Sequence, residues 1–321
     1  MTGLDQGAAG SPFAPGDDVP VAVPGASSST TKNHLVSDES DGLRPANTLQ
    51  SAFASSSRLG RRGLDGLRSS LSARDWAVLG SVAEHRYLTT KHVMGLHFAD
   101  HASQSTASSV TRRVLRRLSS LRILSHLERR VGGVRAGSAS YVWRVGPVGS
   151  RLLRGEAATP RRWQYEPGSK FLGHCLAIAD AHLALVMTDR TAQLQLLTVQ
   201  LEPTCWRTFT GLGGGRLVLQ PDLYIVTGAG QFEDHWFLEI DRGTESLNTL
   251  LGKCQQYEAY RRSGIEQAEG GGFPLVTWVL PDGQRADRLR QAVARVQGLN
   301  PDFFRMTTYD AFVGLIAGGA A

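Results

Sequence analysis

Apolar residues recur at helical spacing in three successive runs within residues 71–124. The first run follows Ser72, which we expect to cap a helix because Asp75 stands three residues further on. The second, shorter run begins at Thr89 or Thr90, and a serine-rich turn separates it from the third. In the third run, valine or leucine takes every third or fourth position, with arginines between them. The pattern predicts three amphipathic helices in this order.

Two strand-like runs follow, at 123–131 and 138–145, and a loop rich in glycine and arginine joins them. Three helices followed by a hairpin is the element order of a winged helix-turn-helix domain. The third helix would then enter the DNA major groove, with the hairpin as a wing beside the backbone. The alternative is that this fold serves as a protein-interaction module. The side chains predicted to contact DNA are Arg112, Arg113, Arg116 and Arg117 on the helix, and Arg129, Arg130 and Arg135 on the wing.

Strand-like and helix-like runs alternate in the second half of the chain. The predicted helices cover 171–188, 244–262 and 285–296, with a further short helix at the C-terminal end. The predicted strands are 194–203, 217–226, 235–241, 274–281 and 303–309. Helices that cross over between strands produce an α/β domain with a mixed sheet. We therefore expect an α+β protein of two domains, a winged helix-turn-helix followed by this α/β domain.

Composition suggests where the domains begin and end. Residues 1–57 are rich in Ser, Ala, Gly and Pro, and they hold too few apolar side chains to offset the entropy of ordering. A connector that contains proline and glycine separates the two folded parts. The predicted boundaries are 1–66 for a disordered arm, 67–155 for the DNA-binding domain, 156–168 for a linker and 169–318 for the α/β domain.

Positive charge is concentrated in the first folded part. Residues 58–154 hold eighteen basic and five acidic side chains, a net charge of +13. Residues 1–57 carry −4 and residues 155–321 carry −3. Such an asymmetry is typical of a protein that binds nucleic acid, because the phosphate backbone is attracted to a basic surface. Double-stranded DNA is therefore the predicted partner.

Cysteine usage and the apolar runs bear on where the protein works. The three cysteines lie far apart and form no CxxC pair, so neither a disulfide framework nor a cysteine zinc site is supported. Apolar runs such as 273–280 are much too short to cross a bilayer. Asp5 stands where a secretory signal would have lysines and an apolar core. We expect a cytoplasmic protein with no membrane partner.

Three carboxylates form the candidate site. Glu239 and Asp241 alternate along one strand and project from the same face, and Asp222 lies on the preceding strand. Such acids repel one another unless a cation neutralises them. Mg²⁺ or Mn²⁺ is one candidate cation, since carboxylate oxygens suit both. The alternative is that Arg242 and Lys253 pair with the acids and fasten a helix to the sheet. The facing helix is predicted to present Lys253, Gln256 and Tyr260 in one stripe.

This order of elements resembles the common core of the PD-(D/E)xK nuclease superfamily. The residues that carry the resemblance are Pro221 with Asp222, Glu239 with Asp241, and Gln256 with Tyr260. The resemblance implies that the acids hold the metal ion, which acts with a lysine to activate water for attack on a phosphodiester. Asp241 replaces the lysine expected two residues after Glu239, and Lys253 would supply that amine from the helix instead.

Residues 71–315 resemble the replication-relaxation family of actinobacterial and Gram-positive mobile elements. The matching segments read YVWRVGPVGSRLL, FLGHCLAIADAHLAL, PDLYI and WFLEIDRGTES, and EIDRGTES is the most specific of them. The resemblance implies a role in replication or DNA relaxation of plasmids and integrative elements.

Three functions remain open at this point. The first is a DNA-binding protein of a mobile element that acts in plasmid replication, DNA relaxation or transfer. The second is a DNA nuclease or nickase that depends on Mg²⁺ or Mn²⁺, and it alone needs a cofactor. The third is a homodimeric regulator whose second domain is a scaffold that recruits replication or conjugation proteins.

Overall fold

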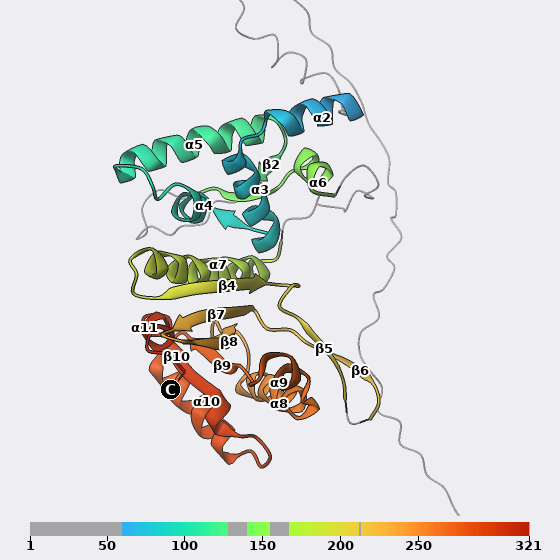
Figure 1. The fold of residues 1–321 in the computed structure, drawn as a ribbon, viewed down its shortest axis with the longest axis vertical. Coiled ribbons are helices and arrows are strands. Elements are labelled where there is room, and N and C mark those ends of the chain that lie inside the picture. Colours follow the sequence, from blue (N-terminus) through green and yellow to red (C-terminus); the bar gives the residue numbers. More distant parts are fainter. Residues whose placement is uncertain (1–59, 128–139, 155–166, 212, 321) are drawn as a thin grey trace, which may run out of the picture. The chain divides into compact units, whose positions relative to one another are not determined.

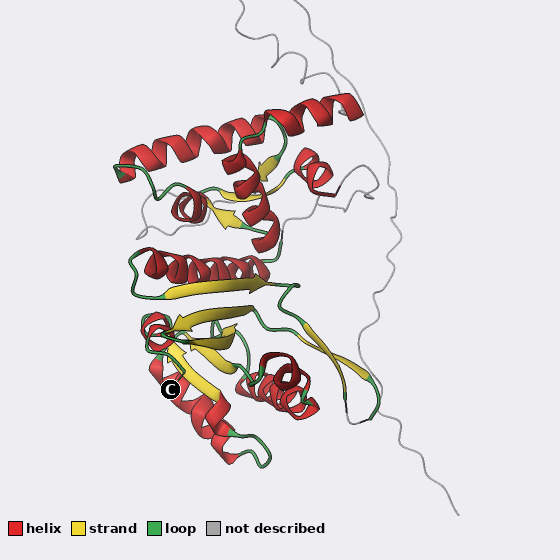
Figure 2. Ribbon diagram, in the orientation of Figure 1, coloured by secondary structure: helices red, strands yellow, loops and turns green. Residues whose placement is uncertain are grey.

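The computed structural model describes residues 60–127, 140–154, 167–211 and 213–320. The described chain is α+β with a mixed sheet, as the periodicity of the sequence predicts (Figures 1 and 2). Arg129, Arg130 and Arg135 lie outside the described residues. The predicted end of the arm at residue 66 falls inside helix α2 (Arg61–Ser70), whose Leu64 is buried in the first core.

The first part of the described chain combines helices with a small antiparallel sheet. After α2 come α3 (Ala73–His85), β1 (Leu88–Thr89), α4 (Thr90–His97), α5 (Gln104–Ser120), β2 (Leu124–His126) and β3 (Val142–Val145). The strands lie in the order β1-β3-β2. Leu79 of α3, Val93 of α4 and Leu115 of α5 are fully buried and belong to the same hydrophobic cluster. The apolar stripes recognised in the sequence therefore meet in one core, and the arginines between them face outward.

Helix α3 begins with the capping box that the sequence indicates. The Ser72 side chain accepts a hydrogen bond from the Asp75 N–H, and the Asp75 carboxylate accepts one from the Ser72 N–H at 3.0 Å. Thr89 caps α4 in the same way, with His92 as its partner. Helix α5 begins earlier than predicted, because Ser103 caps it and residues 104–109 continue the helix instead of a turn. Serine is favoured both in turns and at helix N-caps, so the serine-rich composition did not show that the helix begins at this point.

Two glycines shape the turn between β3 and helix α6 (Pro147–Arg154). A Cβ atom on Gly146 would lie 2.3 Å from the carbonyl oxygen of Arg122. One on Gly149 would lie 2.2 Å from the carbonyl oxygen of Ile123. Both contacts are with backbone, so a side-chain rotamer change cannot relieve them. The VGPVG stretch thus lets α6 pack directly on the chain that enters β2.

Helix α7 (Ser169–Arg190) packs on both parts of the described chain. Ala179 belongs to the core of the first part, whereas Ile178 and Leu185 belong to a core on the large sheet. This helix is long and apolar enough to cross a membrane by length and composition. Contact on two sides explains that composition, since a helix covered on opposite faces carries apolar residues around most of its circumference.

The large sheet has five strands, and its order is β10-β9-β8-β7-β4. The strands are β4 (Gln195–Leu201), β7 (Leu223–Ala229), β8 (Phe232–Ile240), β9 (Leu275–Leu280) and β10 (Phe304–Thr308). β4, β7 and β8 pair antiparallel, and β8, β9 and β10 pair parallel, so the sheet is mixed as predicted. Helices α8 (Leu247–Ser263) and α10 (Gly283–Arg295) cover one face, and α7 and α11 (Phe312–Ala317) cover the other.

The run predicted as one strand at 217–226 forms two strands in different sheets. β6 (Arg216–Leu219) pairs with β5 (Arg207–Thr210) in a separate hairpin, and β7 begins at Leu223. Pro221 lies at the break and has no N–H to donate to a sheet ladder. The chain turns there and brings Asp222 to the end of the large sheet. Helix α9 (Ile265–Gly270) and the short helix η1 (Pro301–Phe303) complete the described elements.

Candidate functional site

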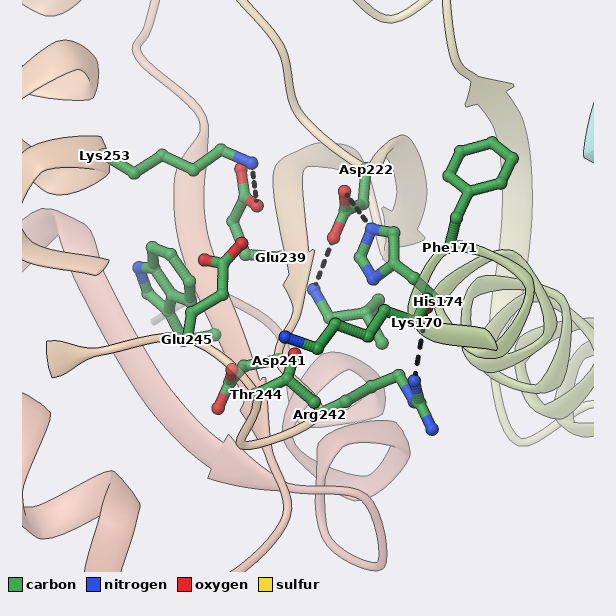
Figure 3. Close-up of a pocket in the computed structure, with 12 residues that line it drawn as sticks. Lys170, Phe171, His174, Asp222, Glu239, Asp241, Arg242, Thr244, Glu245 and Lys253 are labelled. Atoms are coloured by element: carbon green, nitrogen blue, oxygen red, sulfur yellow. Dashed lines mark hydrogen bonds and ion pairs between the residues drawn. The ribbon is translucent and has the colours of Figure 1, made fainter. Parts of the chain in front are cut away.

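A cavity of about 350 Å³ opens at the end of strand β8, between that strand and helices α7 and α8 (Figure 3). In the antiparallel pair of β7 and β8, Leu223 lies opposite Leu238, and this register carries Asp222 to the level of Glu239. Most of the residues that line the cavity have polar or charged side chains. The side chains that line it include Lys170, Phe171, His174, Asp222, Glu239, Asp241, Arg242, Thr244, Glu245 and Lys253.

Asp222 is almost fully buried and has two partners from different elements. Its Oδ2 accepts the backbone N–H of Ile240 at 2.7 Å, and its Oδ1 lies 3.1 Å from His174 Nε2. Burial by itself would raise the pKa of Asp222, but His174, Lys253 and the Ile240 amide outweigh it and lower the pKa. The Asp222 hydrogen bond likewise raises the pKa of His174 against the effect of burial. Asp222 is therefore an anion, and it favours a proton on His174.

Glu239 is also buried, and helix α8 supplies both of its partners. Lys253 Nζ lies 2.5 Å from Oε2, and the hydroxyl of Tyr257 donates to Oε1 at 2.5 Å. Burial raises the pKa of Glu239, and Lys253 limits the rise. Burial alone would lower the pKa of Lys253, but Glu239 and Asp222 raise it overall, so the amine keeps its proton. The sequence left open an alternative in which Lys253 pairs with an acid and fastens helix α8 to the sheet. The ion pair between Lys253 and Glu239 is a contact of that kind.

Asp241 belongs to a different set of contacts. Its carboxylate forms a two-pronged pair with the guanidinium of Arg285 on α10, with Oδ1 3.1 Å from one nitrogen. The same guanidinium donates to the carbonyl oxygen of Glu245 at 2.7 Å. Arg242, which the sequence offers as a partner for the acids, instead lies against helix α7 at Gly173, where a Cβ would stand 2.3 Å from it. Asp241 therefore anchors α10 to the end of β8.

All six oxygens of the three predicted metal ligands already have partners within the protein. Asp222 has Ile240 and His174, Glu239 has Lys253 and Tyr257, and Asp241 has Arg285. Within the described ranges, no group of three or more His, Cys, Asp or Glu side chains is arranged to hold a metal ion. In this arrangement the three acids do not form a fitting site for Mg²⁺ or Mn²⁺, because Lys253 occupies the side of Glu239 that a cation would need.

Of the three residues predicted to form a stripe on helix α8, Lys253 contacts one of the three acids, and the other two do not. Gln256 is exposed to solvent, and Tyr260 donates its hydroxyl to Glu266, away from the three acids. Tyr257, four residues after Lys253, is the tyrosine that reaches Glu239. Sequence reasoning also missed His174 and Arg285 as partners of the acids. The i to i+4 spacing from Lys253 could have identified Tyr257, whereas the other two come from distant elements.

The predicted DNA-contacting arginines of α5 are exposed along one side of that helix. Arg112, Arg113 and Arg116 have no ion-pair or hydrogen-bond partner among the described residues. Arg117 pairs with Asp75, the partner of Ser72 in the α3 capping box, while 45% of the Arg117 side chain stays exposed. Burial would raise the pKa of Asp75, but Arg117 and Ser72 lower it overall. Arg117 therefore holds α5 to α3, and the other three arginines are available to an outside partner.

The stretch of chain from α3 to β9 also matches a known protein family. A family model described as replication-relaxation matches residues 79–276, which is more than half of the chain. The chain belongs to the replication-relaxation family. Neither the curated proteins nor the solved structures compared with it include one that matches.

Membership in the replication-relaxation family suggests a role in the replication or relaxation of plasmids and mobile elements. The matched residues include α5, α7 and the acids of the cavity, and they end within β9. The family match therefore covers both the exposed arginines and the buried ionic cluster.

Proposed function

We propose that this replication-relaxation protein binds double-stranded DNA of a mobile element through helix α5, as the recognition helix of a winged helix-turn-helix domain. The observation that carries the proposal is the row of exposed arginines on α5, three of which have no partner among the described residues. Arginine side chains on a helix in the major groove contact phosphates and the edges of bases. The binding would act in plasmid replication, relaxation or transfer, in the cytoplasm.

The elements around α5 support this proposal. Helices α3, α4 and α5 precede the antiparallel strands β2 and β3, which is the order of a winged domain. The net charge of +13 over residues 58–154 adds a long-range attraction for DNA. Arg129, Arg130 and Arg135, which lie outside the described residues, are proposed as further DNA contacts, and replication or conjugation proteins are proposed as partners.

Replacement of Arg112, Arg113 and Arg116 by alanine is expected to weaken duplex binding by about tenfold or more at low salt. If all three contact phosphates, the slope of log K against log salt should become less steep by about 2.7. Fluorescence anisotropy with a labelled duplex, repeated from 50 to 200 mM salt, measures both quantities. Arg117 is left unchanged because its loss would also release Asp75.

The matched control removes the same charge from another part of the chain. Arg216, Arg288 and Arg295 are exposed outside α5 and have no ion-pair partner in the described part of the protein. Their triple alanine variant should keep most of the duplex affinity and the original salt slope. Equal losses in the two triple variants would show that only the net charge matters, and α5 would then not be the recognition helix.

A metal-dependent DNA nuclease or nickase is the second candidate function. The observation in its favour is that Asp222 and Glu239, two buried carboxylates from neighbouring strands, meet Lys253 at one cavity. The arrangement described above would have to change for an ion to bind, because Lys253 contacts Glu239 directly. The proposed ligands are Asp222, Glu239 and Asp241, with Lys253 as the assisting amine.

Incubation with supercoiled plasmid and Mn²⁺ tests this candidate. If it is correct, nicked circles should accumulate with the wild-type chain and disappear with Asp222→Asn. Asp302→Asn, a change at an exposed acid on η1, is the control and should keep the activity. Intact plasmid with Mg²⁺, Mn²⁺ and other divalent ions would reject the nuclease and favour the scaffold that recruits replication or transfer proteins.

A further inference from the structure

A second cavity adjoins the one described above, and Phe171 lines both. It has a volume of about 630 Å³ and lies among α3, α6, the start of α7 and the segment that follows β4. Its wall is partly aromatic, with Tyr87 and Trp206 in addition to Phe171. The two cavities therefore meet at one aromatic ring near the first turn of α7.

The Phe171 ring is held in place by neighbouring side chains and is still accessible. The Arg86 guanidinium lies 5.8 Å from the ring centroid, and the ring of Tyr87 meets it edge-on at 6.3 Å. Arg86 is itself fixed, by an ion pair with Glu202 at 3.3 Å and by a left-handed backbone with φ of 66°. Phe171 nevertheless remains 44% exposed. An exposed large aromatic with fixed neighbours is suited to a partner that offers another flat apolar face.

Several cationic side chains line the two cavities that share this ring. Lys170, Arg154 and Arg242 line one cavity or the other, and none has a carboxylate partner among the described residues. Of the acids nearby, Glu202 pairs with Arg86 and Asp241 pairs with Arg285, whereas Glu245 is exposed and its carboxylate has no cationic partner among the described residues. Glu84 also lines the second cavity, and partial burial raises the pKa of its carboxyl group. The rim therefore offers unpaired positive charge beside an aromatic platform.

We propose that Phe171 is a stacking platform for a base of single-stranded DNA, whose phosphates contact Lys170, Arg154 and Arg242. A charged rim that follows the backbone and an aromatic ring that stacks a base are the two parts of a single-strand site. A base within a duplex is covered on both faces by its neighbours, so it cannot present the face that Phe171 needs. The inference rests on the proposed function only in taking DNA as the partner, and it adds a surface separate from α5.

Photo-crosslinking with the full-length chain locates the contact. The probe is a fluorescently labelled oligothymidine in which one position carries 5-iodouracil, and mass spectrometry identifies the crosslinked peptide. We expect the crosslink at Phe171, and a crosslink that maps only to α5 would overturn the proposal. In anisotropy titrations with the same probe, Phe171→Ala should bind roughly tenfold more weakly, as expected for loss of one stacked base.

Two further variants separate stacking from a change of structure. Phe171→Trp keeps a flat aromatic face and should bind the oligonucleotide about as well as wild type. Phe232→Ala removes another exposed phenylalanine, at the turn between β7 and β8, and should have no effect. Equal affinities of Phe171→Ala and wild type would overturn the proposal, as would competition by thymidine monophosphate as effective as that by unlabelled oligonucleotide.

The α5 triple variant separates this inference from the proposed function. Arg112, Arg113 and Arg116 changed to alanine should weaken duplex binding and leave single-strand binding within about twofold of wild type. Phe171→Ala should weaken single-strand binding and leave duplex binding within about twofold of wild type. Loss of both activities in the α5 variant alone would place single-strand binding on α5 and reject the role of Phe171.

Discussion

Acidification from pH 7 to pH 5 is expected to lower the free energy of unfolding of this protein by roughly 2–5 kcal/mol. The effect arises from three histidines where α3 and α4 meet α7. Burial lowers the pKa of His85 to about 3, and that of His97 and His182 to about 4. Each histidine therefore stays neutral in the folded protein at pH 5, whereas the unfolded chain takes up protons near pH 6.5.

The hydrogen bonds explain why these rings resist a second proton. His85 Nδ1 lies 2.8 Å from the carbonyl oxygen of Ser81, which only accepts, so Nδ1 carries the hydrogen. His85 Nε2 must then accept from His182 Nδ1, at 2.9 Å. A further proton on His85 would set two N–H groups against each other. Arg190 and Arg74 add to the effect of burial at His97, because both oppose a positive charge there.

The lowered pKa values of the three histidines determine that stability falls as the pH falls. Above pH 6.5 the three histidines are neutral in both the folded and the unfolded protein, so they do not reduce the free energy of unfolding. Below that pH the unfolded chain binds more protons, and stability falls by roughly 1.4 kcal/mol per pH unit for each histidine involved. Because His97 and His182 are partly exposed, we expect less than three full contributions. Urea denaturation at intervals from pH 5 to pH 7.5 gives the slope.

Two single variants identify the source of the slope. His85→Asn removes the most buried of the three rings. The slope of the free energy of unfolding against pH should then decrease by an amount that corresponds to about one proton. His126→Asn changes an exposed histidine on β2 and should leave the slope as it is in wild type. Equal stability of the wild-type protein at pH 5 and pH 7 would contradict the prediction.

Lys253→Met should be the most damaging single change at the candidate site, with a loss of about 3 kcal/mol at neutral pH. The variant leaves Glu239 buried, 2% exposed at its side chain, with Tyr257 as its remaining partner. A buried carboxylate without its cation is strongly disfavoured, and 27% exposure of the Lys253 side chain keeps the loss at the lower end of the usual range. Thermal and urea unfolding measure it.

The pH dependence of this variant has the opposite sign to that of the histidines. Burial raises the pKa of Glu239 above its ordinary 4.5, and removal of Lys253 raises it further. The folded variant therefore holds a proton that the unfolded chain releases, so stability present below pH 4.5 is lost as the pH rises through the folded pKa. The gap between Lys253→Met and wild type should be larger at pH 8 than at pH 5.

The controls for this variant come from the same cavity. Lys170→Met removes an exposed lysine and should cost less than about 0.5 kcal/mol. The double variant Lys253→Met with Glu239→Gln removes both charges and should recover much of the stability, because Tyr257 can still donate to the amide oxygen. If Lys253→Met proves as stable as wild type at pH 8, the ion pair contributes nothing and the prediction is wrong.

Local patterns predicted most of the described elements, because each depends on residues close in sequence. Ser72 with Asp75 and Thr89 with its neighbours set the starts of α3 and α4 through caps within one turn. The alternation around Glu239 placed Glu239 and Asp241 on the α8 and α10 side of the sheet and Leu238 on the other. The run at 217–226, which was predicted as one strand, is interrupted at Pro221 because proline has no N–H to donate to a sheet ladder.

The pairing of charged groups was much harder to predict, since it depends on which elements lie side by side. Asp241 pairs with Arg285, forty-four positions later, and not with the adjacent Arg242. Asp222 contacts His174, forty-eight positions earlier. On α8, Tyr257 reaches Glu239, whereas Tyr260, three positions later, reaches Glu266. A helix turns about 100° per residue, so a small rotation of α8 about its axis changes which tyrosine faces the acid.

The sequence by itself determined most of the helices and strands of the described chain, the basic face of α5 and the family signature around Glu239. Those features depend on local spacing and on charge, which need no knowledge of distant contacts. Only the tertiary structure decided that Lys253 and Arg285 neutralise the acids, that His85 and His182 share a hydrogen bond, and that Phe171 joins two cavities. Each of these joins elements far apart in the chain, and their approach is set by packing of the whole core.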